Sequence, residues 1–257
     1  MKYGKLFGVG VGPGDPRLMT LHAVDVLNRA DVIVIPQSSK HIKSVAWRIA
    51  EQHVSDNPDQ ERLYLTFPMS KDPSKTGPAW EIAIKEIGDR ISEGKDIAFI
   101  SEGDPLFYST FIYLLRSAKK IWPDAEIEIV PAVSSFTAVP AVIKMPIADG
   151  LERVAVIPAS YGLEDLPEIL KLFDTIFLMK VSSVMPRLVE ILESQNLLEK
   201  SVYVSRATMD GQSIITDMDS IKNDRCDYFS MVMVCKQSRN GHIIPDEEKL
   251  SVLARGN

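Results

Sequence analysis

The chain of 257 residues is 45% hydrophobic and 25% charged, and its formal net charge at pH 7 is -6. This composition is ordinary for a soluble globular protein, and the length fits two domains of about 110–140 residues better than one. The acidic charge argues against a nucleic-acid-binding protein, which usually presents a basic face.

The first half of the chain alternates between strand and helix patterns. Strands are predicted over residues 5–11, 31–36, 63–67, 96–101 and 127–130. A helix with Leu18, Leu21, Val24 and Leu27 on its buried side follows the first strand, and further helices are predicted near residues 45–53, over residues 79–92 and from Pro105 onward. Residues 69–78 are predicted to form an exposed loop. Five strand–helix units in about 130 residues predict an α/β domain with a mainly parallel sheet.

The second half begins with a helix over residues 134–144, entered through a serine cap and interrupted at Pro140. Strands are predicted over residues 153–158, 175–181, 201–205, 213–216 and 229–235. Helices are predicted over residues 164–172 and through Val184, Leu188, Ile191 and Leu192. The last strands follow too closely for long helices between them, which favours antiparallel pairing and a mixed sheet. We therefore expect domains at residues 1–131 and 132–257, with a linker near residues 145–152.

The stretch over residues 94–110 predicts a ligand site. A buried strand ends in the turn Ser101-Glu102-Gly103-Asp104-Pro105, and an apolar helix with Phe107, Phe111, Leu114 and Leu115 on one face is expected next. In α/β sheets, ligands bind at the carboxyl ends of the strands. Gly103 would let a ligand approach the backbone, and Asp104 would place a carboxylate there. An ordinary loop in which Asp104 caps a helix explains the spacing equally well.

Several other site types are excluded by their patterns. The N-terminal glycines never form G-x-G-x-x-G, and Pro13 removes an amide that a pyrophosphate would need, so a nicotinamide or flavin site is disfavoured. No metal site is expected, because His22, His41, His53 and His242 lie far from each other and from Cys226 and Cys235. No run approaches the roughly 18 apolar residues of a membrane span, and no signal peptide is evident. The two cysteines have no CxxC spacing, so we expect a cytoplasmic protein with reduced thiols, and Cys235 as a core residue.

Taken together, the turns carry a more specific pattern. They are GVGVGPGDP (8–16), SEGDP (101–105), VPAVSSF (130–136), FLMKV (177–181) and SRATMDGQ (205–212). In order and spacing, over residues 4–236, they resemble the tetrapyrrole methylase family, the class III S-adenosylmethionine-dependent methyltransferases. The segments 67–72, 99–115 and 129–136 are most similar to the branch that methylates carbon 20 of precorrin-2 or cobalt-factor II on the route to cobalamin (vitamin B12). Two residues depart from the common family pattern, since Glu102 and Ala132 stand where many members have glycine.

The resemblance implies two α/β domains with the active site in the cleft between them, usually in a homodimer. It implies that S-adenosylmethionine, which leaves as S-adenosylhomocysteine, contacts Pro13, Glu102, Gly103, Asp104, Ser134, Ser135, Met179, Arg206 and Ala207. A base must remove the proton from carbon 20 after methylation. Asp104 is the first candidate and Tyr108 the second, although Asp104 could instead bind the cofactor or cap a helix.

The implied substrate carries eight carboxylates, so a local basic trough is expected despite the acidic chain. Six residues could reach such a substrate, although each could equally be a solvated surface charge: Lys40, Lys43, Lys71, Lys75, Lys180 and Arg206. Alternative functions are methylation at another ring carbon, or of diphthine or a ribosomal RNA ribose, a Rossmann-type oxidoreductase, and a non-catalytic binding protein. Neither nucleic acid nor membrane is expected as a partner.

Overall fold

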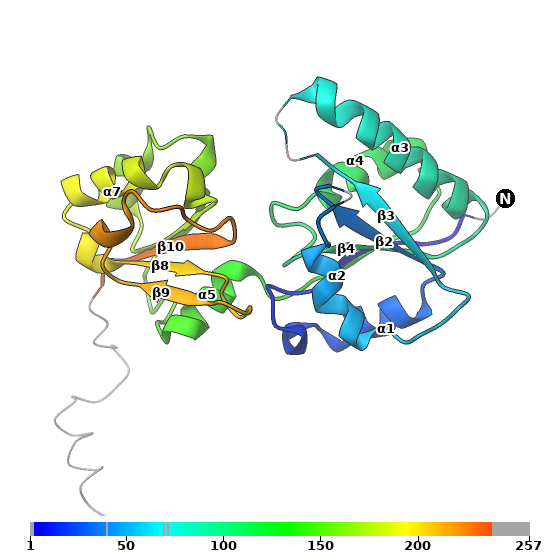
Figure 1. The fold of residues 1–257 in the computed structure, drawn as a ribbon, viewed down its shortest axis with the longest axis horizontal. Helices are drawn as coiled ribbons and strands as arrows, with labels where there is room; N and C mark the ends of the chain where they lie inside the picture. The colour runs from blue at the N-terminus through cyan, green and yellow to red at the C-terminus, as the bar shows by residue number, and fades with distance from the viewer. Residues whose placement is uncertain (1–2, 40, 69, 71, 238–257) are drawn as a thin grey trace, which may run out of the picture. The chain divides into compact units, whose positions relative to one another are not determined.

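The computed structural model describes residues 3–39, 41–68, 70 and 72–237. The chain divides into two compact units, an N-terminal unit of residues 1–138 and a C-terminal unit of residues 139–257 (Figure 1). Helix α5 (Ser135–Ile143) contains the boundary between them, and Pro140 lies inside this helix. Each unit is built around its own five-stranded sheet.

The sheet of the N-terminal unit is entirely parallel, with the order β3-β2-β4-β1-β5, which confirms the predicted α/β class. Its strands are β1 (Leu6–Gly10), β2 (Val32–Gln37), β3 (Glu61–Thr66), β4 (Ile97–Ser101) and β5 (Ile127–Val130). Helices α1 (Leu21–Arg29) and α2 (Val45–Ala50) pack on one face, and α3 (Pro73–Ser92) and α4 (Phe111–Ile121) pack on the other (Figure 1). Strands β1 and β4 are fully buried, as the central strands of a doubly covered parallel sheet should be.

The buried face of α1 differs from the predicted one. The helix begins only after Thr20, whose hydroxyl accepts a hydrogen bond from the amide of Ala23 (3.1 Å). It buries Ala23, Val26 and Leu27, while Leu21 is 85% exposed. The prediction failed because Leu18 belongs to a separate short 3-10 turn, Pro16–Leu18, and so does not share the helical period.

Helix α3 begins at Pro73 rather than near residue 79, so the predicted loop over residues 69–78 was wrong for most of its length. The carboxylate of Asp72 accepts a hydrogen bond from the amide of Ser74 (3.0 Å), and Pro73 occupies the first helical position. Pro78 lies inside the helix, near its start and exposed, where one missing hydrogen bond is tolerated. Met69 and Lys71 lie outside the described residues.

The helix predicted from Pro105 is also shorter than expected, because α4 begins at Phe111. Tyr108 has a φ of 52°, which interrupts a right-handed helix. Phe107 lies in the preceding turn, where its ring packs against that of Phe136 at 4.9 Å between centroids. The helix buries Phe111, Leu114 and Ala118.

The sheet of the C-terminal unit is mixed, with the order β6-β7-β10-β8-β9, as predicted. Strand β6 (Val154–Pro158) is parallel to β7 (Thr175–Met179). Strand β10 (Ser230–Cys235) runs antiparallel to both β7 and β8 (Ser201–Ser205), and β9 (Ser213–Ile215) is antiparallel to β8. Helices α6 (Leu166–Leu172) and α7 (Met185–Ser194) cover one apolar core. Cys235 is buried in β10 as expected, and both cysteines are free.

None of the helices within the described residues is both long enough and apolar enough to cross a membrane.

Candidate functional site

The turns after β1 and β4 lie side by side at the carboxyl edge of the parallel sheet. The amide of Val11 donates to the carbonyl of Ser101 (2.9 Å), and the amide of Gly103 donates to the carbonyl of Gly12 (2.8 Å). Gly12 and Gly103 form an isolated antiparallel bridge. Two of the motifs identified in the sequence thus form one structure, at the edge where α/β sheets bind ligands.

Gly103 presents bare backbone at this edge. Its φ of 65° is in the left-handed region that glycine adopts without strain. A Cβ atom placed there would meet no other atom within 4 Å, so the backbone faces open space. A ligand can therefore reach the main-chain groups of this turn directly.

Asp104 fastens this turn to the loop that follows β5. Its Oδ2 accepts a hydrogen bond from the amide of Ala132 (3.0 Å), and its Oδ1 accepts one from the amide of Leu106 (2.9 Å). Strand β1 lies between β4 and β5, so the contact passes over the end of β1 at Gly10. A Cβ atom on Gly10 would lie 2.6 Å from both the Cβ of Ala132 and the carbonyl oxygen of Gly103. Ala132 itself has no positive φ, so the loop accommodates alanine there.

Glu102 differs from Asp104 in its environment. Its side chain makes no hydrogen bond or ion pair with any other described residue. Burial disfavours the charged carboxylate and raises the pKa of Glu102 to about 7, although the positive charge of Arg48 on α2 acts in the opposite direction. A carboxyl group of this kind exchanges protons near neutral pH.

The other site residues predicted in the N-terminal unit lie on adjoining loops. Pro13 is buried directly after Gly12, and Tyr108 is 43% exposed with its ring 4.8 Å from that of Phe107. Ser134 is buried at the start of α5, where its carbonyl accepts hydrogen bonds from the next turn of the helix. Ser135 is the first residue of that helix. These residues follow β1, β4 and β5, three neighbouring strands of one sheet.

In the C-terminal unit, Met179 and Arg206 mark the carboxyl ends of β7 and β8. Both strands pair antiparallel with β10, so their carboxyl ends meet at the edge where β10 begins. The amide of Arg206 donates to the carbonyl of Phe229 (2.7 Å), and Ala207 follows in the same turn. Three residues here have a positive φ without being glycine, namely Lys180, Arg206 and Thr208. Such backbone strain is concentrated at functional sites in proteins.

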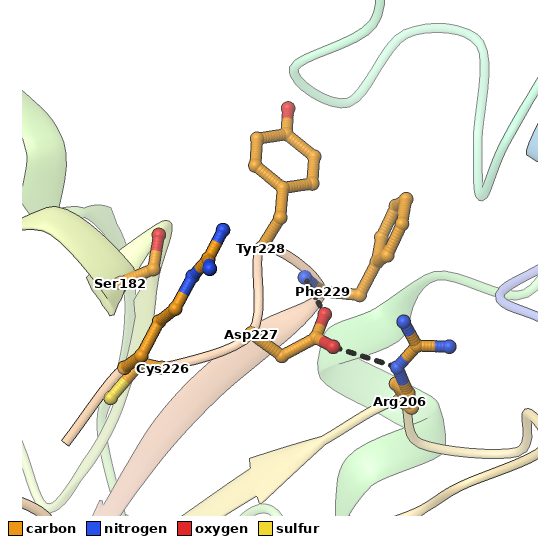
Figure 2. Close-up of a pocket in the computed structure, with 7 residues that line it drawn as sticks. Ser182, Arg206, Cys226, Asp227, Tyr228 and Phe229 are labelled. Atoms are coloured by element: carbon orange, nitrogen blue, oxygen red, sulfur yellow. Dashed lines mark hydrogen bonds and ion pairs between the residues drawn. The ribbon is translucent and has the colours of Figure 1, made fainter. Parts of the chain in front are cut away.

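A hollow of about 530 Å³ opens at this edge (Figure 2). It is lined by Ser182, Arg206, Arg225, Cys226, Asp227, Tyr228 and Phe229. The Nε of Arg206 donates to Oδ2 of Asp227 (2.7 Å), as Figure 2 shows. Burial is the largest single influence and would raise the pKa of Asp227. The hydrogen bonds from Arg206 and from the amide of Phe229, together with the positive charge of Arg206, outweigh it and lower that pKa. Arg225 is exposed and has no ion pair with the described carboxylates.

Arg225 was missed by the sequence reasoning, because it lies in an irregular segment without a motif. The lysines proposed as substrate contacts are scattered by comparison. Lys43 is exposed before α2, and Lys75 is exposed in the first turn of α3. Lys180 lies over the ring of Tyr161, at 5.8 Å from Nζ to the centroid. Lys40 and Lys71 lie outside the described residues, as does His242.

Among the described residues, no three acidic, cysteine or histidine side chains cluster as metal ligands.

Comparison with known proteins places these observations in one family. The chain is 33% identical to the probable cobalt-precorrin-2 C(20)-methyltransferase of Methanocaldococcus jannaschii, over 91% of this chain and 97% of that one. It is 32% identical to the cobalt-precorrin-2 C(20)-methyltransferase of Salmonella typhimurium, with the same coverage of both chains. The fold matches that of the cobalt precorrin-4 methyltransferase CbiF with a TM-score of 0.69 and 23% identity, over 90% of this chain and 94% of that one.

A second solved structure is the uroporphyrin-III C-methyltransferase of Thermus thermophilus, complexed with S-adenyl homocysteine. It matches with a TM-score of 0.64 and 17% identity, over 90% of this chain and 97% of that one. The family model for tetrapyrrole (corrin/porphyrin) methylases matches residues 5–221. The chain therefore belongs to the tetrapyrrole methylase family.

Proposed function

We propose that this protein transfers the methyl group of S-adenosylmethionine to carbon 20 of precorrin-2 or of cobalt-factor II, a step in the synthesis of cobalamin. The observation that carries the proposal is similarity over nine-tenths of the chain to relatives named for methylation at that one carbon. Two of these relatives are named for the cobalt-containing substrate, and a third, from Sinorhizobium, is named precorrin-2 C(20)-methyltransferase at 28% identity. The failed dinucleotide fingerprint and the family match both argue against an oxidoreductase.

The cofactor is proposed to contact Pro13, Glu102, Gly103, Asp104, Ser134 and Ser135 in the N-terminal unit and Met179, Arg206 and Ala207 in the C-terminal unit. The open backbone at Gly103 supports this assignment, because a ligand can reach main-chain donors and acceptors there. The carboxyl group of Glu102 beside it suits a positively charged ligand. When bound, S-adenosylmethionine supplies a methyl group already activated by its positive sulfur. The residues around it then have to orient the reactants and exclude water.

Asp104 and Tyr108 are the two residues that the family resemblance suggests as candidates for the final proton transfer. Both carboxylate oxygens of Asp104 accept backbone hydrogen bonds, which supports its alternative role as a residue that positions the loops around the site. Tyr108 is held by the strained turn before α4 with its side chain partly exposed. It stays a candidate contact to substrate.

We place the carboxylate side chains of the substrate at the hollow of the C-terminal unit. Arg206 is already paired with Asp227, whereas Arg225 has no carboxylate partner among the described residues. A guanidinium group forms two parallel hydrogen bonds with a carboxylate, so Arg225 is the better candidate of the two.

As the family resemblance implies, we further propose a homodimer that works in the cytoplasm. Size-exclusion chromatography with light scattering tests the dimer, and fractionation of the source cells tests the location. A monomeric mass at micromolar concentration would reject the dimer without affecting the proposed reaction.

The reaction itself is tested by anaerobic incubation of the protein with S-adenosylmethionine and either cobalt-factor II or metal-free precorrin-2. We expect mass spectrometry and NMR to find one added methyl group on carbon 20 of at least one of them. S-adenosylhomocysteine should raise the melting temperature and NADH should not. Methylation of neither substrate by a protein that binds S-adenosylhomocysteine would reject the proposed carbon and retain the family.

A further inference from the structure

Two carboxyl groups stand in the turn after β4, and the structure gives them different tasks. Asp104 uses both oxygens to hold the amides of Leu106 and Ala132. The ionised carboxylate of Asp104 is thus required for the structure of the loops, because protonation would weaken both hydrogen bonds. Glu102 has no such contacts among the described residues. It is therefore free to take up a proton without disturbing the loop.

We propose that Glu102 is the base that removes the proton from carbon 20, while Asp104 positions the loops around it. The proposal rests on the proposed function. Glu102 directly follows β4 and precedes Gly103, whose backbone faces open space. The carboxyl group thus stands at the carboxyl edge of the sheet, beside backbone that a ligand can reach at Gly103.

The proton balance of the step is simple. After the methyl group has bonded to carbon 20, that carbon also carries its original hydrogen and the ring system carries one positive charge. As the C–H bond breaks, an O–H bond forms on Glu102 and the C–H electron pair returns to the ring, which becomes neutral. The neutral carboxylic acid then loses its proton to solvent, which restores the base.

The surroundings of Glu102 suit this cycle. A general base works best when its pKa lies near the working pH, and burial raises the pKa of Glu102 to about 7. Of the charged groups on neighbouring elements, Arg48 of α2 opposes this shift. Asp15, in the turn after β1, is paired with Arg17, and Asp104 is held by its two amides. At neutral pH a substantial fraction of Glu102 is therefore ionised and can accept a proton.

The first test is the variant Glu102→Gln, which keeps the shape and removes the charge. We expect methyl transfer to fall by a factor of about 100 or more, which is the typical contribution of a general base. In the wild-type protein, kcat/KM should rise with pH and level off above about 7, because the base must be deprotonated. This acid limb should vanish in Glu102→Gln, although the variant should still bind S-adenosylhomocysteine, which lacks the positive charge on sulfur. Glu81→Gln, the same exchange at an exposed position on α3, should retain the wild-type rate and pH profile.

The second test does not depend on turnover. In protein labelled with ¹³C-glutamate at the carboxyl carbon, one resonance should titrate near pH 7, should be absent in Glu102→Gln and should persist in Asp104→Asn. A Glu102 resonance that titrates near the ordinary glutamate value, or an acid limb that survives in Glu102→Gln and disappears in Asp104→Asn, would overturn the assignment. If the wild-type protein methylates neither substrate, the proposed function itself is rejected. The wild-type assay alone therefore distinguishes that failure from a failure of the Glu102 assignment.

Discussion

Gly10 illustrates how one absent side chain permits a contact between two loops. The Asp104–Ala132 hydrogen bond crosses the end of β1, and a Cβ atom on Gly10 would lie 2.6 Å from the backbone and side-chain atoms on either side. Gly10 is not among the residues with a positive φ, so its backbone conformation alone does not require glycine. The close approach of the neighbouring atoms is what requires it.

We expect Gly10→Ala to lower the free energy of unfolding by about 1–3 kcal/mol, because the added methyl group overpacks a filled site. Urea denaturation measures the change. Gly77→Ala is the matched control, because a Cβ at that helical position meets no atom within 4 Å. Alanine should leave stability there unchanged or raise it by about 0.5–1 kcal/mol. Equal effects of the two substitutions would show that the crossing over β1 is not tightly packed.

Gly103 makes a separate prediction about binding. Alanine at a φ of 65° costs about 1–2 kcal/mol of stability, and its methyl group would also occupy the open space in front of the turn. We therefore expect Gly103→Ala to weaken binding of S-adenosylhomocysteine at least tenfold by calorimetry. Gly150→Ala has the same kind of φ, 54°, and the same free space, but lies outside the site. It should show a similar loss of stability with unchanged affinity, and a tenfold loss there as well would contradict the assignment of the Gly103 turn.

At the scale of whole elements, the strands followed directly from the sequence, whereas the starts of helices α1, α3 and α4 did not. Buried parallel strands are short apolar runs, and β2 and β4 lie within a residue of their predicted limits. Helix α3 was predicted too short because its prolines suggested a loop, although Pro73 suits a first helical turn. Helix α4 was predicted too long because the residue types around Tyr108 do not indicate that Tyr108 has a positive φ. The same turn makes tertiary contacts that the local sequence does not reveal, among them the packing of Phe107 on Phe136.

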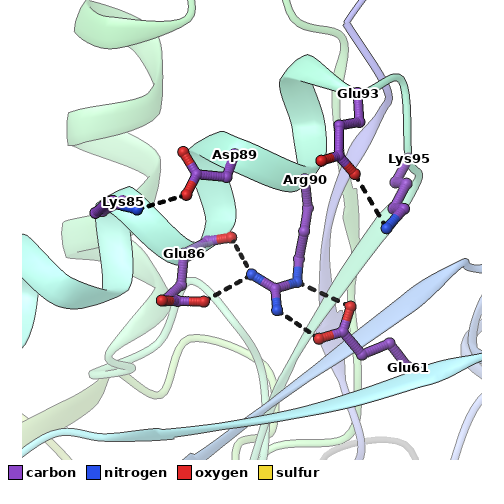
Figure 3. A network of polar contacts seen from close by, with 7 residues as sticks. All are labelled: Glu61, Lys85, Glu86, Asp89, Arg90, Glu93 and Lys95. Atoms are coloured by element: carbon purple, nitrogen blue, oxygen red, sulfur yellow. Dashed lines mark hydrogen bonds and ion pairs between the residues drawn. The ribbon is translucent and has the colours of Figure 1, made fainter.

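The long helix α3 is fixed to the sheet by a network around Arg90 (Figure 3). The guanidinium group contacts both carboxylate oxygens of Glu61 at the start of β3, at 2.9 and 2.5 Å, and also Glu86 one helical turn away at 2.8 Å. Only 19% of the Arg90 side chain is exposed, so these contacts are less screened than those of ordinary surface pairs. The hydrogen bond from Arg90 holds the pKa of Glu61 below its usual range.

We expect Arg90→Ala to lower the free energy of unfolding by about 1–2 kcal/mol at neutral pH, because it removes a bidentate contact between helix and strand. The folded-state pKa of Glu61 is lowered, so the pair stabilises the fold above the unfolded-state pKa and loses this effect as the pH falls through the folded value. The difference between variant and wild type should therefore shrink below pH about 4 in urea titrations. Lys85→Ala, which removes an exposed pair with Asp89, should lower the free energy of unfolding much less than Arg90→Ala does, because solvent screens that pair. A cost for Arg90→Ala that does not change with pH would assign the effect to packing instead.

At the scale of the whole molecule, the sequence pointed to the family and to the two sheets, but only in part to the site. The motifs marked the ends of β1, β4, β7 and β8. Those after β1 and β4 contain the glycine and proline residues that such turns need. Arg225 carries no such mark. It became a candidate only when the antiparallel pairing of β10 with β7 and β8 brought the segment before β10 to their carboxyl ends.

The net charge of the molecule opposes the binding of its proposed substrate, because the chain has a net charge of -6 and the substrate carries several carboxylates. Long-range attraction is therefore not available, and binding has to depend on local cations. We expect Arg225→Ala to raise KM for the tetrapyrrole about tenfold or more, since one charge-assisted contact contributes about 1.5–3 kcal/mol and about 1.4 kcal/mol is a factor of ten. The variant should leave kcat within about twofold and should not affect binding of S-adenosylhomocysteine. Lys222→Ala removes a nearby positive charge from outside the hollow and should change KM little. If both variants raised KM equally, and if added salt removed the difference from wild type in both, the general field of this segment would account for binding. A KM effect confined to Arg225→Ala, and largely retained in salt, would place a substrate carboxylate at the hollow of the C-terminal unit.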